Sequence, residues 1–311
     1  MRRALVLFTF LFAALATPTF AHPGLHHEIE RLTKLIQKDP TRTDLLLARA
    51  QTYRLDKQYA KAIEDLDRAA TLNADASQLA LERGLSLSGL GRDDAAVLEL
   101  TKHLAGSRPM ANGYAERAAI RERRRQAAEA IDDWTAAIAL VPKVDWYLAR
   151  GRLQESLDRI DDAANGFREG LSRCTGAVPI RLELLRLEAS RGNYEAAISL
   201  IDDVLPRAAV KTDWYLRRAD VQTAAGKFDA ACEDRRIALD EADRAVARRP
   251  TAQRLITRAK VLIALDNSTK AAADLKAALQ KSPSLAEAEQ LLRQIERKDD
   301  SSPFSASAPM P

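Results

Sequence analysis

Hydrophobic and polar positions follow one another along this chain in a unit of about 34 residues, which is clearest between Thr43 and Ala76. The unit contains two stretches with an apolar face, LLLARAQTYRL and AKAIEDLDRAATL, and a short polar segment separates them. Apolar residues spaced in this way predict amphipathic helices. We therefore expect each unit to fold as two short helices joined by a turn.

The unit recurs along the chain, as two independent rows of small residues show. Both rows advance by 34, 34, 33, 34, 34 and 40 residues, and a fixed period of this size indicates a helical repeat array. The eighth position is small in every copy except one, which has Leu185. The rows are Ala50, Gly84, Ala118, Gly151, Ala219 and Ala259 at the eighth position, and Ala62, Ala96, Ala130, Ala163, Ala197, Ala231 and Ala271 at the twentieth.

Other positions of the unit carry a second pattern, of aromatic residues and proline. The fourth position has Tyr114, Tyr147 and Tyr215, the seventeenth Tyr59, Tyr194 and Phe228, and the thirty-second Pro142 and Pro283. Together with the small residues, this pattern resembles the tetratricopeptide repeat family. The resemblance implies an all-α fold, a right-handed α-solenoid of about seven helix-turn-helix repeats over residues 41–285. Leu185, and Arg235 at the usually apolar twenty-fourth position, predict loose packing in repeats five and six.

Each end of the array is predicted to carry a capping helix, because terminal repeats need a polar outer face. Residues 22–40 form one cap and residues 285–297 the other, which Ser284 and Glu287 would open as a capping box. Residues 298–311 have little to bury and are expected to be disordered. The six extra residues before repeat seven are expected to lengthen the second helix of repeat six.

Residues 1–21 have the pattern of a secretory signal peptide: a basic start, an apolar middle and small residues at the end. We expect cleavage after Ala21 and export, most simply to the periplasm. The alternative is an uncleaved segment that anchors the chain in a membrane at its amino terminus.

The composition and the absence of known catalytic motifs limit the classes of function that the sequence supports. The sequence has 48 basic and 44 acidic residues, and without Arg2 and Arg3 the balance is 46 to 44, a net charge of +2. A charge so close to zero gives no general reason to expect binding to nucleic acid. No nucleophile elbow, Gly-rich phosphate loop or paired His-Glu zinc motif is present, so we expect a protein that is not an enzyme and needs no cofactor. Cys174 and Cys232 lie two repeats apart and are expected to be free, packed thiols.

Three histidines, His22, His26 and His27, crowd the expected mature amino terminus. Imidazoles with a free amine can bind copper or zinc. A metal-binding function there remains a minor alternative.

Arginine occupies the seventh position in six repeats, and the twenty-third position is acidic in five of them. We interpret these residues as ion pairs between the two helices of a repeat; the alternative is a basic stripe for phosphate or nucleic acid. The predicted pairs are Arg49–Asp65, Arg83–Glu99, Arg117–Asp133, Arg218–Asp234 and Arg258–Asp274. The basic run from Arg121 to Arg125 is interpreted as a solvated helix end, with an anionic docking patch as the alternative.

The resemblance also implies a binding groove, lined by the first helix of each repeat at its second, fifth, ninth and twelfth to thirteenth positions. The fifth position would give an apolar floor of Leu47, Leu81, Leu148, Leu182, Leu216 and Ile256. The ninth, twelfth and thirteenth would add Arg54, Arg123, Arg152, Arg186 and Lys260. We therefore expect a protein partner, a peptide or helix with apolar anchors and an acidic end. Two alternatives remain: these arginines pair with Glu122 and Glu155 and bind nothing, or the chain is a structural subunit of an envelope complex.

Overall fold

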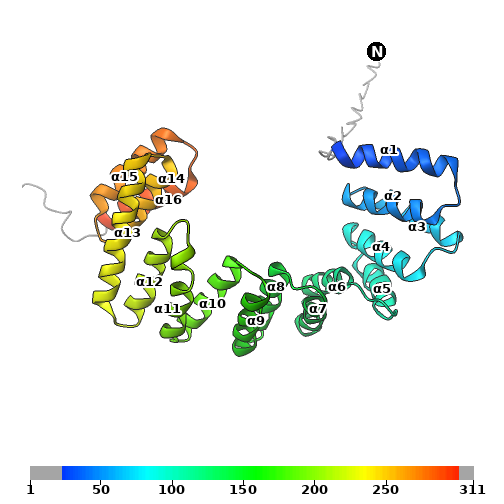
Figure 1. Ribbon diagram of the computed structural model, residues 1–311, viewed down its shortest axis with the longest axis horizontal. Coiled ribbons are helices and arrows are strands. Elements are labelled where there is room, and N and C mark those ends of the chain that lie inside the picture. The colour runs from blue at the N-terminus through cyan, green and yellow to red at the C-terminus, as the bar shows by residue number, and fades with distance from the viewer. Residues whose placement is uncertain (1–22, 301–311) are drawn as a thin grey trace, which may run out of the picture. The chain divides into compact units, whose positions relative to one another are not determined.

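The computed structural model describes residues 23–300, and within them every regular element is a helix (Figure 1). The chain divides into two compact units, Met1–Asp158 and Arg159–Pro311, which are described separately. We call them unit 1 and unit 2. The predicted signal peptide, His22 and most of the expected tail lie outside the described residues. The predicted fold class, an all-α solenoid of helix-turn-helix repeats, is confirmed.

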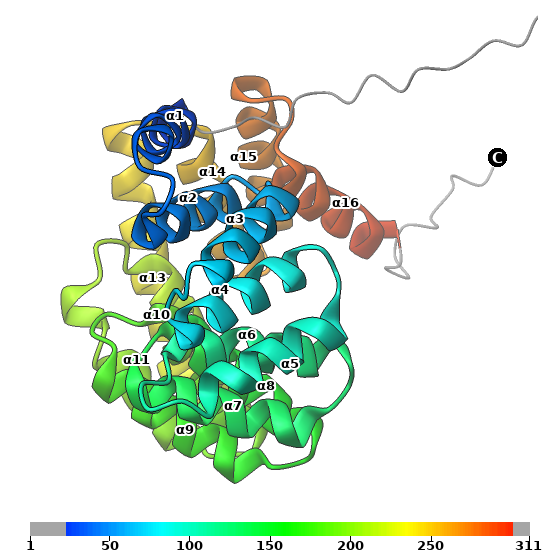
Figure 2. The same ribbon diagram turned by 90° about the vertical axis from the view of Figure 1, so that its right-hand side faces the viewer.

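Unit 1 contains α1 (Pro23–Lys38), α2 (Thr43–Leu55), α3 (Tyr59–Thr71), α4 (Ala76–Gly89), α5 (Asp93–Leu104), α6 (Ala111–Arg123), α7 (Ala127–Leu140) and α8 (Val144–Ser156). Unit 2 contains α9 (Ile160–Arg173), α10 (Val178–Ser190), α11 (Tyr194–Asp202), the 3₁₀ turn η1 (Leu205–Arg207), α12 (Thr212–Ala224), α13 (Phe228–Arg248), α14 (Ala252–Ala264), α15 (Ser268–Lys281) and α16 (Ala286–Asp300). Helices that follow one another in the chain lie side by side within a unit, as α2 and α3 do in Figure 2.

The turn between the two helices of a repeat has the same backbone geometry throughout. The fifteenth position of the repeat, which follows the first helix, has a positive φ in all seven repeats. Helices commonly end on a residue in this left-handed conformation. In repeat three the amide of Gln126 donates to the carbonyl of Arg121 at 2.9 Å, the long bond of a Schellman motif. The left-handed residues are Lys57, Gly91, Arg125, Asp158, Gly192, Gly226 and Asp266.

Close helix crossings explain the small residues at the eighth and twentieth positions. Ala118 and Ala130 are fully buried in repeat three. At Gly84, a Cβ atom would lie 2.7 Å from Cγ of Leu100, closer than carbon atoms tolerate. Larger side chains at the twenty-fourth position, such as Leu100 and Trp134, then fill the space beside the crossing.

Loose packing was predicted for repeats five and six, and the two repeats differ in the structure. In repeat five the second helix, α11, has only 9 residues and gives way to η1. Repeat six is not loose: α12 and α13 pack along their length, so that prediction is wrong. The guanidinium of Arg235 donates to Thr223 Oγ1 at 2.9 Å and lies 3.9 Å from Asp220, whereas its buried Nε has no hydrogen-bond partner in the part of the chain that the structure describes.

The ends of the array carry α1 and α16. Leu32 and Ile36 bury the inner face of α1, and Ala288 and Ile295 that of α16. The expected capping box at Ser284 is wrong: α16 begins at Ala286, and the carbonyl of Leu285 accepts its first amide bonds. The extra residues do lengthen α13, which has 21 residues against 14 in α15.

Candidate functional site

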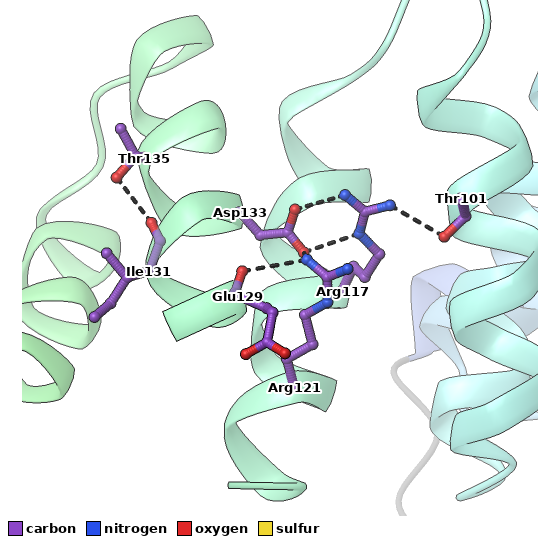
Figure 3. Close-up of polar contacts among 7 residues, drawn as sticks. All are labelled: Thr101, Arg117, Arg121, Glu129, Ile131, Asp133 and Thr135. Carbon is purple, nitrogen blue, oxygen red and sulfur yellow. Dashed lines mark hydrogen bonds and ion pairs between the residues drawn. The ribbon is translucent and has the colours of Figure 1, made fainter. Parts of the chain in front are cut away.

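Arginine at the seventh position joins the two helices of repeats one, three, six and seven, as predicted. In repeat three, Arg117 on α6 donates through Nε and Nη2 to both carboxylate oxygens of Asp133 on α7, at 2.8 and 2.6 Å (Figure 3). Asp133 is only 3% exposed, and a buried bidentate pair is among the strongest of ion pairs. The same geometry confirms the pairs Arg49–Asp65, Arg218–Asp234 and Arg258–Asp274. The hydrogen bond to the aspartate raises the pKa of Arg49, Arg218 and Arg258 above the ordinary value.

The predicted pair of repeat two is wrong. Arg83 donates to Asp67 on α3, in the preceding repeat, at 2.5 Å. Glu99 accepts instead from Lys102, which stands one helical turn later on the same face of α5. Glu99 and Arg83 thus each bond another residue, Lys102 and Asp67, and these two bonds replace the predicted bond across the repeat.

A further contact of these arginines was missed from the sequence. Arg117 Nη1 also donates to Thr101 Oγ1 on α5 at 3.0 Å, so one guanidinium ties together three helices (Figure 3). Arg49 bonds Thr33 on α1 in the same way, and Arg218 bonds Asp202 on α11. The acceptors mostly stand 16 residues before the arginine, a spacing that could have shown the contact. These arginines therefore stabilise the stack of helices, and they do not form a free basic stripe.

The basic run at the end of α6 is also engaged with neighbouring helices. Arg121 donates to Asp133 at 2.7 Å and to the carbonyl of Glu129 at 3.2 Å (Figure 3). Arg123 donates to Asp93 at 2.7 Å, and Arg124 to Asp94 at 2.6 Å. The run is thus largely a set of helix-to-helix ion pairs.

A hollow of about 380 Å³ lies where the carboxyl ends of α2, α4 and α6 come together in unit 1. Six of its nine lining residues occupy the ninth, twelfth or thirteenth position of three successive repeats, which the family resemblance assigns to a binding groove. We call this hollow the unit 1 groove. Its lining residues are Arg54, Leu55, Lys57, Tyr59, Leu85, Ser88, Gly89, Glu116 and Arg123.

The charged residues of the unit 1 groove are held in place by hydrogen bonds. Arg54 Nε donates to the buried carboxylate of Glu82 at 2.8 Å. Arg123 Nη2 donates to Asp93, and to Ser88 Oγ at 3.2 Å. The bond to Asp93 raises the pKa of Arg123 above its ordinary value, against the desolvation that lowers it. Both guanidinium groups are therefore oriented before any ligand arrives.

The apolar part of the groove is partly open to solvent. Leu55 is 59% exposed, and Leu85 is half-buried beside it. Gly89 makes room for the ring of Tyr59, because a Cβ atom there would lie 2.4 Å from the ring carbons. The groove thus offers an aliphatic surface bordered by oriented cations.

The other predicted groove residues lie in different environments. Leu47, Leu81 and Ile256 are buried in the interior, so the apolar floor is covered at these three places. The remaining floor residues, Leu148, Leu182 and Leu216, are half-buried.

The predicted basic residues outside the unit 1 groove are divided between the units. Arg152 is exposed on α8 in unit 1, whereas Arg186 lies on α10 in unit 2 and pairs with Glu183 at 3.0 Å. Lys260 lies on α14 and is ion-paired with Glu287. Of the predicted basic residues, the structure places Arg54 and Arg123 together in one groove.

The structure also shows the surroundings of the histidines and cysteines that were considered for metal binding and as packed thiols. His26 and His27 are exposed on α1, and in residues 23–300 no three metal-ligating side chains gather into a possible metal site. Both cysteines are free, but Cys232 is exposed rather than packed. Among the described helices, none combines the length and apolar character that crossing a membrane requires.

Comparison with known proteins shows the fold. No family model matches the sequence, and neither does any curated protein. The carboxy-terminal part of a TPR repeat-containing protein from Cytophaga hutchinsonii is 18% identical, over 79% of this chain and 99% of that chain, with a TM-score of 0.55. The chain therefore has the tetratricopeptide-repeat fold.

Two further structures are less similar in their superposition. A tetratricopeptide repeat protein from Parabacteroides merdae is 20% identical over 87% of this chain and 99% of that chain, with a TM-score of 0.43. YrrB, a TPR protein with an unusual peptide-binding site, is 15% identical over 68% of this chain and 93% of that chain, with a TM-score of 0.39.

Proposed function

We propose that this chain is a non-catalytic scaffold that binds a peptide or a helix of another protein in the groove formed by the first helices of its repeats. The observation that carries the proposal is the unit 1 groove, where three successive repeats contribute an aliphatic surface and two oriented guanidinium groups. The proposal includes no cofactor and no nucleic acid.

The chemistry of the groove favours a particular kind of segment. Leu55 offers apolar area that an aliphatic side chain would cover, at about 25 cal/mol for each Å² removed from water. Arg54 and Arg123 favour a carboxylate near that side chain, and they lose little freedom on binding because their own bonds hold them. Glu116 in the same wall disfavours a long run of negative charge. A segment with a leucine-like anchor next to one or two acidic residues fits best.

Export forms the second part of the proposal. Residues 1–21 have the order of basic, apolar and small residues that export signals use. Mass spectrometry of the protein purified from its native cell measures this directly. A mature chain that begins at His22 supports export and cleavage, whereas an intact Met1 end contradicts cleavage.

Site-specific photo-crosslinking tests the groove. A crosslinking amino acid placed at position 55 would lie in the unit 1 groove, and one at position 98 on α5 serves as the matched control. Leu55 and Leu98 are 59% and 58% exposed, so both substitutions leave the core intact. We expect a partner polypeptide to be captured in the cell envelope from position 55 and not from position 98.

The substitutions Leu55→Asp and Leu98→Asp extend this test to affinity. The first places a charge on the apolar surface of the groove and should reduce partner capture about tenfold, while the second should leave it unchanged. Equal capture by both variants would place the partner on another face. Co-purification of a stoichiometric complex that neither change affects would favour the structural-subunit alternative.

A further inference from the structure

A second cavity lies in unit 2, between the beginnings of α12 and α14 and the last two turns of α13. Its volume is about 630 Å³, within the range of about 300–1,000 Å³ that is common for ligand sites. We call it the α13 cleft. Its lining residues are Ala209, Val210, Lys211, Thr212, Asp213, Glu241, Ala242, Arg244, Ala245, Arg248, Thr251, Gln253, Arg254 and Thr257.

The α13 cleft exists because α13 is lengthened. One wall is formed by Glu241 and by residues 242–248, the part of α13 that extends beyond the 14 residues of α15. The extra residues of repeat six therefore build a wall that a repeat of ordinary length lacks. The insertion therefore creates a cavity as well as a longer helix.

Positive charge predominates in the cleft. Lys211, Arg244, Arg248 and Arg254 face two acidic residues, Asp213 and Glu241. Arg244 lies 3.8 Å from Glu241, which neutralises part of that charge. The two acidic residues disfavour a polyanion, and the excess of cations favours a ligand with one or two negative charges.

One of the cations is held rigidly. Arg254 Nη1 donates to the carbonyl of Ala245 at 3.0 Å and to that of Arg249 at 3.2 Å. These bonds fix the guanidinium against the end of α13, so a ligand would not have to order it.

The amino end of α12 provides unused hydrogen-bond donors. Thr212 lines the cleft and is only 4% exposed, yet its hydroxyl has no hydrogen-bond partner among residues 23–300. The amides of Thr212 and Asp213 likewise have no acceptor within the part of the chain that the structure describes. At the neighbouring helix α14, by contrast, Thr251 Oγ1 accepts from the amide of Arg254 at 3.3 Å. The hydroxyl of Thr212 and two amides at a helix amino terminus are well suited to an anion.

We propose that the α13 cleft binds a carboxylate carried by a short segment of a partner polypeptide. Thr212 and the first amides of α12 would donate to the carboxylate, and Lys211 and Arg248 would supply the attracting charge. Val210, which is 61% exposed at the rim, would contact an aliphatic side chain beside the carboxylate. The proposal rests on the proposed function only in taking the ligand to be a polypeptide, because the cleft and the unit 1 groove share no residue.

Fluorescence anisotropy with labelled peptides tests the cleft on the full chain. The probe is the peptide Ala-Ala-Leu-Glu-Glu-Val with a free carboxyl terminus. The neutral control peptide has Gln in place of each Glu and an amidated carboxyl terminus. We expect Lys211→Glu with Arg248→Glu to weaken binding of the acidic probe about tenfold. Thr212→Val, which keeps the shape and removes the hydroxyl, should weaken it about threefold. The neutral peptide should bind the parent about tenfold more weakly than the acidic one.

Two controls make the outcome decisive. Lys276→Glu with Lys281→Glu makes the same change of charge at exposed sites of α15, outside the cleft, and should leave the affinity within about twofold. Leu55→Asp alters only the unit 1 groove, so a loss confined to this variant would place the probe in the groove and overturn the cleft. Equal losses in the α15 and cleft variants, or equal binding of the two peptides, would also overturn the proposal. So would inorganic phosphate binding to the cleft while the peptide does not. Failure of groove crosslinking together with retained cleft binding would reject only the proposed groove.

Discussion

Repeats three and five have turns of the same backbone geometry, yet their helices are held together in different ways. In repeat three, the small residues Ala118 and Ala130 are both fully buried, and Arg117 clamps α6 to α7 through Asp133. In repeat five, Leu185 stands at the crossing. Leu184 and Leu200 replace the arginine and the aspartate of the clamp. There α11 is short and ends in η1.

Between these two repeats the crossing residue and the clamp change together, although repeat two shows that a small crossing residue, Gly84, does not by itself bring the clamp. A bidentate pair needs its two helices at a fixed separation, which the small residues at the crossing provide. Once a leucine enters the crossing, an arginine and an aspartate would have been left with poorer geometry and a desolvation cost. Leucine at both positions avoids that cost, and apolar contacts replace the ion pair.

Removal of the clamp should have the largest effect. Asp133→Ala leaves both Arg117 and Arg121 without their buried acceptor, and we expect a loss of about 3 to 4 kcal/mol in the free energy of unfolding. Leu200→Ala at the equivalent position of repeat five should cost only about 1 to 2 kcal/mol, because Leu200 is half-buried and no charge is left behind. Urea unfolding followed by circular dichroism measures both. Equal losses would show that the clamp contributes no more than the leucine pair.

Overpacking the crossing should have the next largest effect. Ala130→Leu places a large side chain at a fully buried position, and we expect a cost near 3 kcal/mol, the upper part of the usual range of about 1–3. Ala197→Leu in repeat five should cost nearer 1 kcal/mol, because its crossing already accommodates Leu185. Thermal melts of the two variants, with matched far-UV spectra, separate them. A larger loss in repeat five would contradict the link between the crossing residue and the helix separation.

Much of this architecture could be predicted from the sequence, because it depends on spacing. The repeat register and the forward bonds of Arg49, Arg117, Arg218 and Arg258 follow from positions that recur every 34 residues or so. What could not be predicted depends on competition between nearby partners. Arg83 finds Asp67 rather than Glu99, a choice that geometry decides and spacing does not.

The candidate sites were less predictable than the fold for a related reason. A position within the repeat says which side of a helix a residue occupies, but not how deeply neighbours cover it. Leu47 and Leu81 are therefore buried, although they stand at positions expected to line the groove. The α13 cleft depends on an irregular insertion, and a periodic pattern contains no information about the cavity that such an insertion builds.

The smallest expected effect concerns the turn, where the two repeats differ again. Position fifteen is Arg125 in repeat three and Gly192 in repeat five, with φ values of 60° and 78°. Glycine adopts this left-handed conformation without the steric cost of a Cβ atom, but it also loses more freedom on folding. We therefore expect Arg125→Gly to stabilise the chain by about 0.5–1 kcal/mol, and Gly192→Ala to destabilise it by about 1 kcal/mol.

The surroundings of these turn residues make the prediction a clean one. No atom lies within 4 Å of the place where a Cβ on Gly192 would stand, so only backbone strain contributes to the loss. A third variant, Arg125→Ala, keeps the left-handed strain and removes only the charge, so it serves as the control for the lost guanidinium. Urea unfolding of the three variants gives the free energies. If Arg125→Gly and Arg125→Ala shift stability equally, the left-handed turn is not what limits repeat three, and the difference between the repeats lies entirely in the crossing and the clamp.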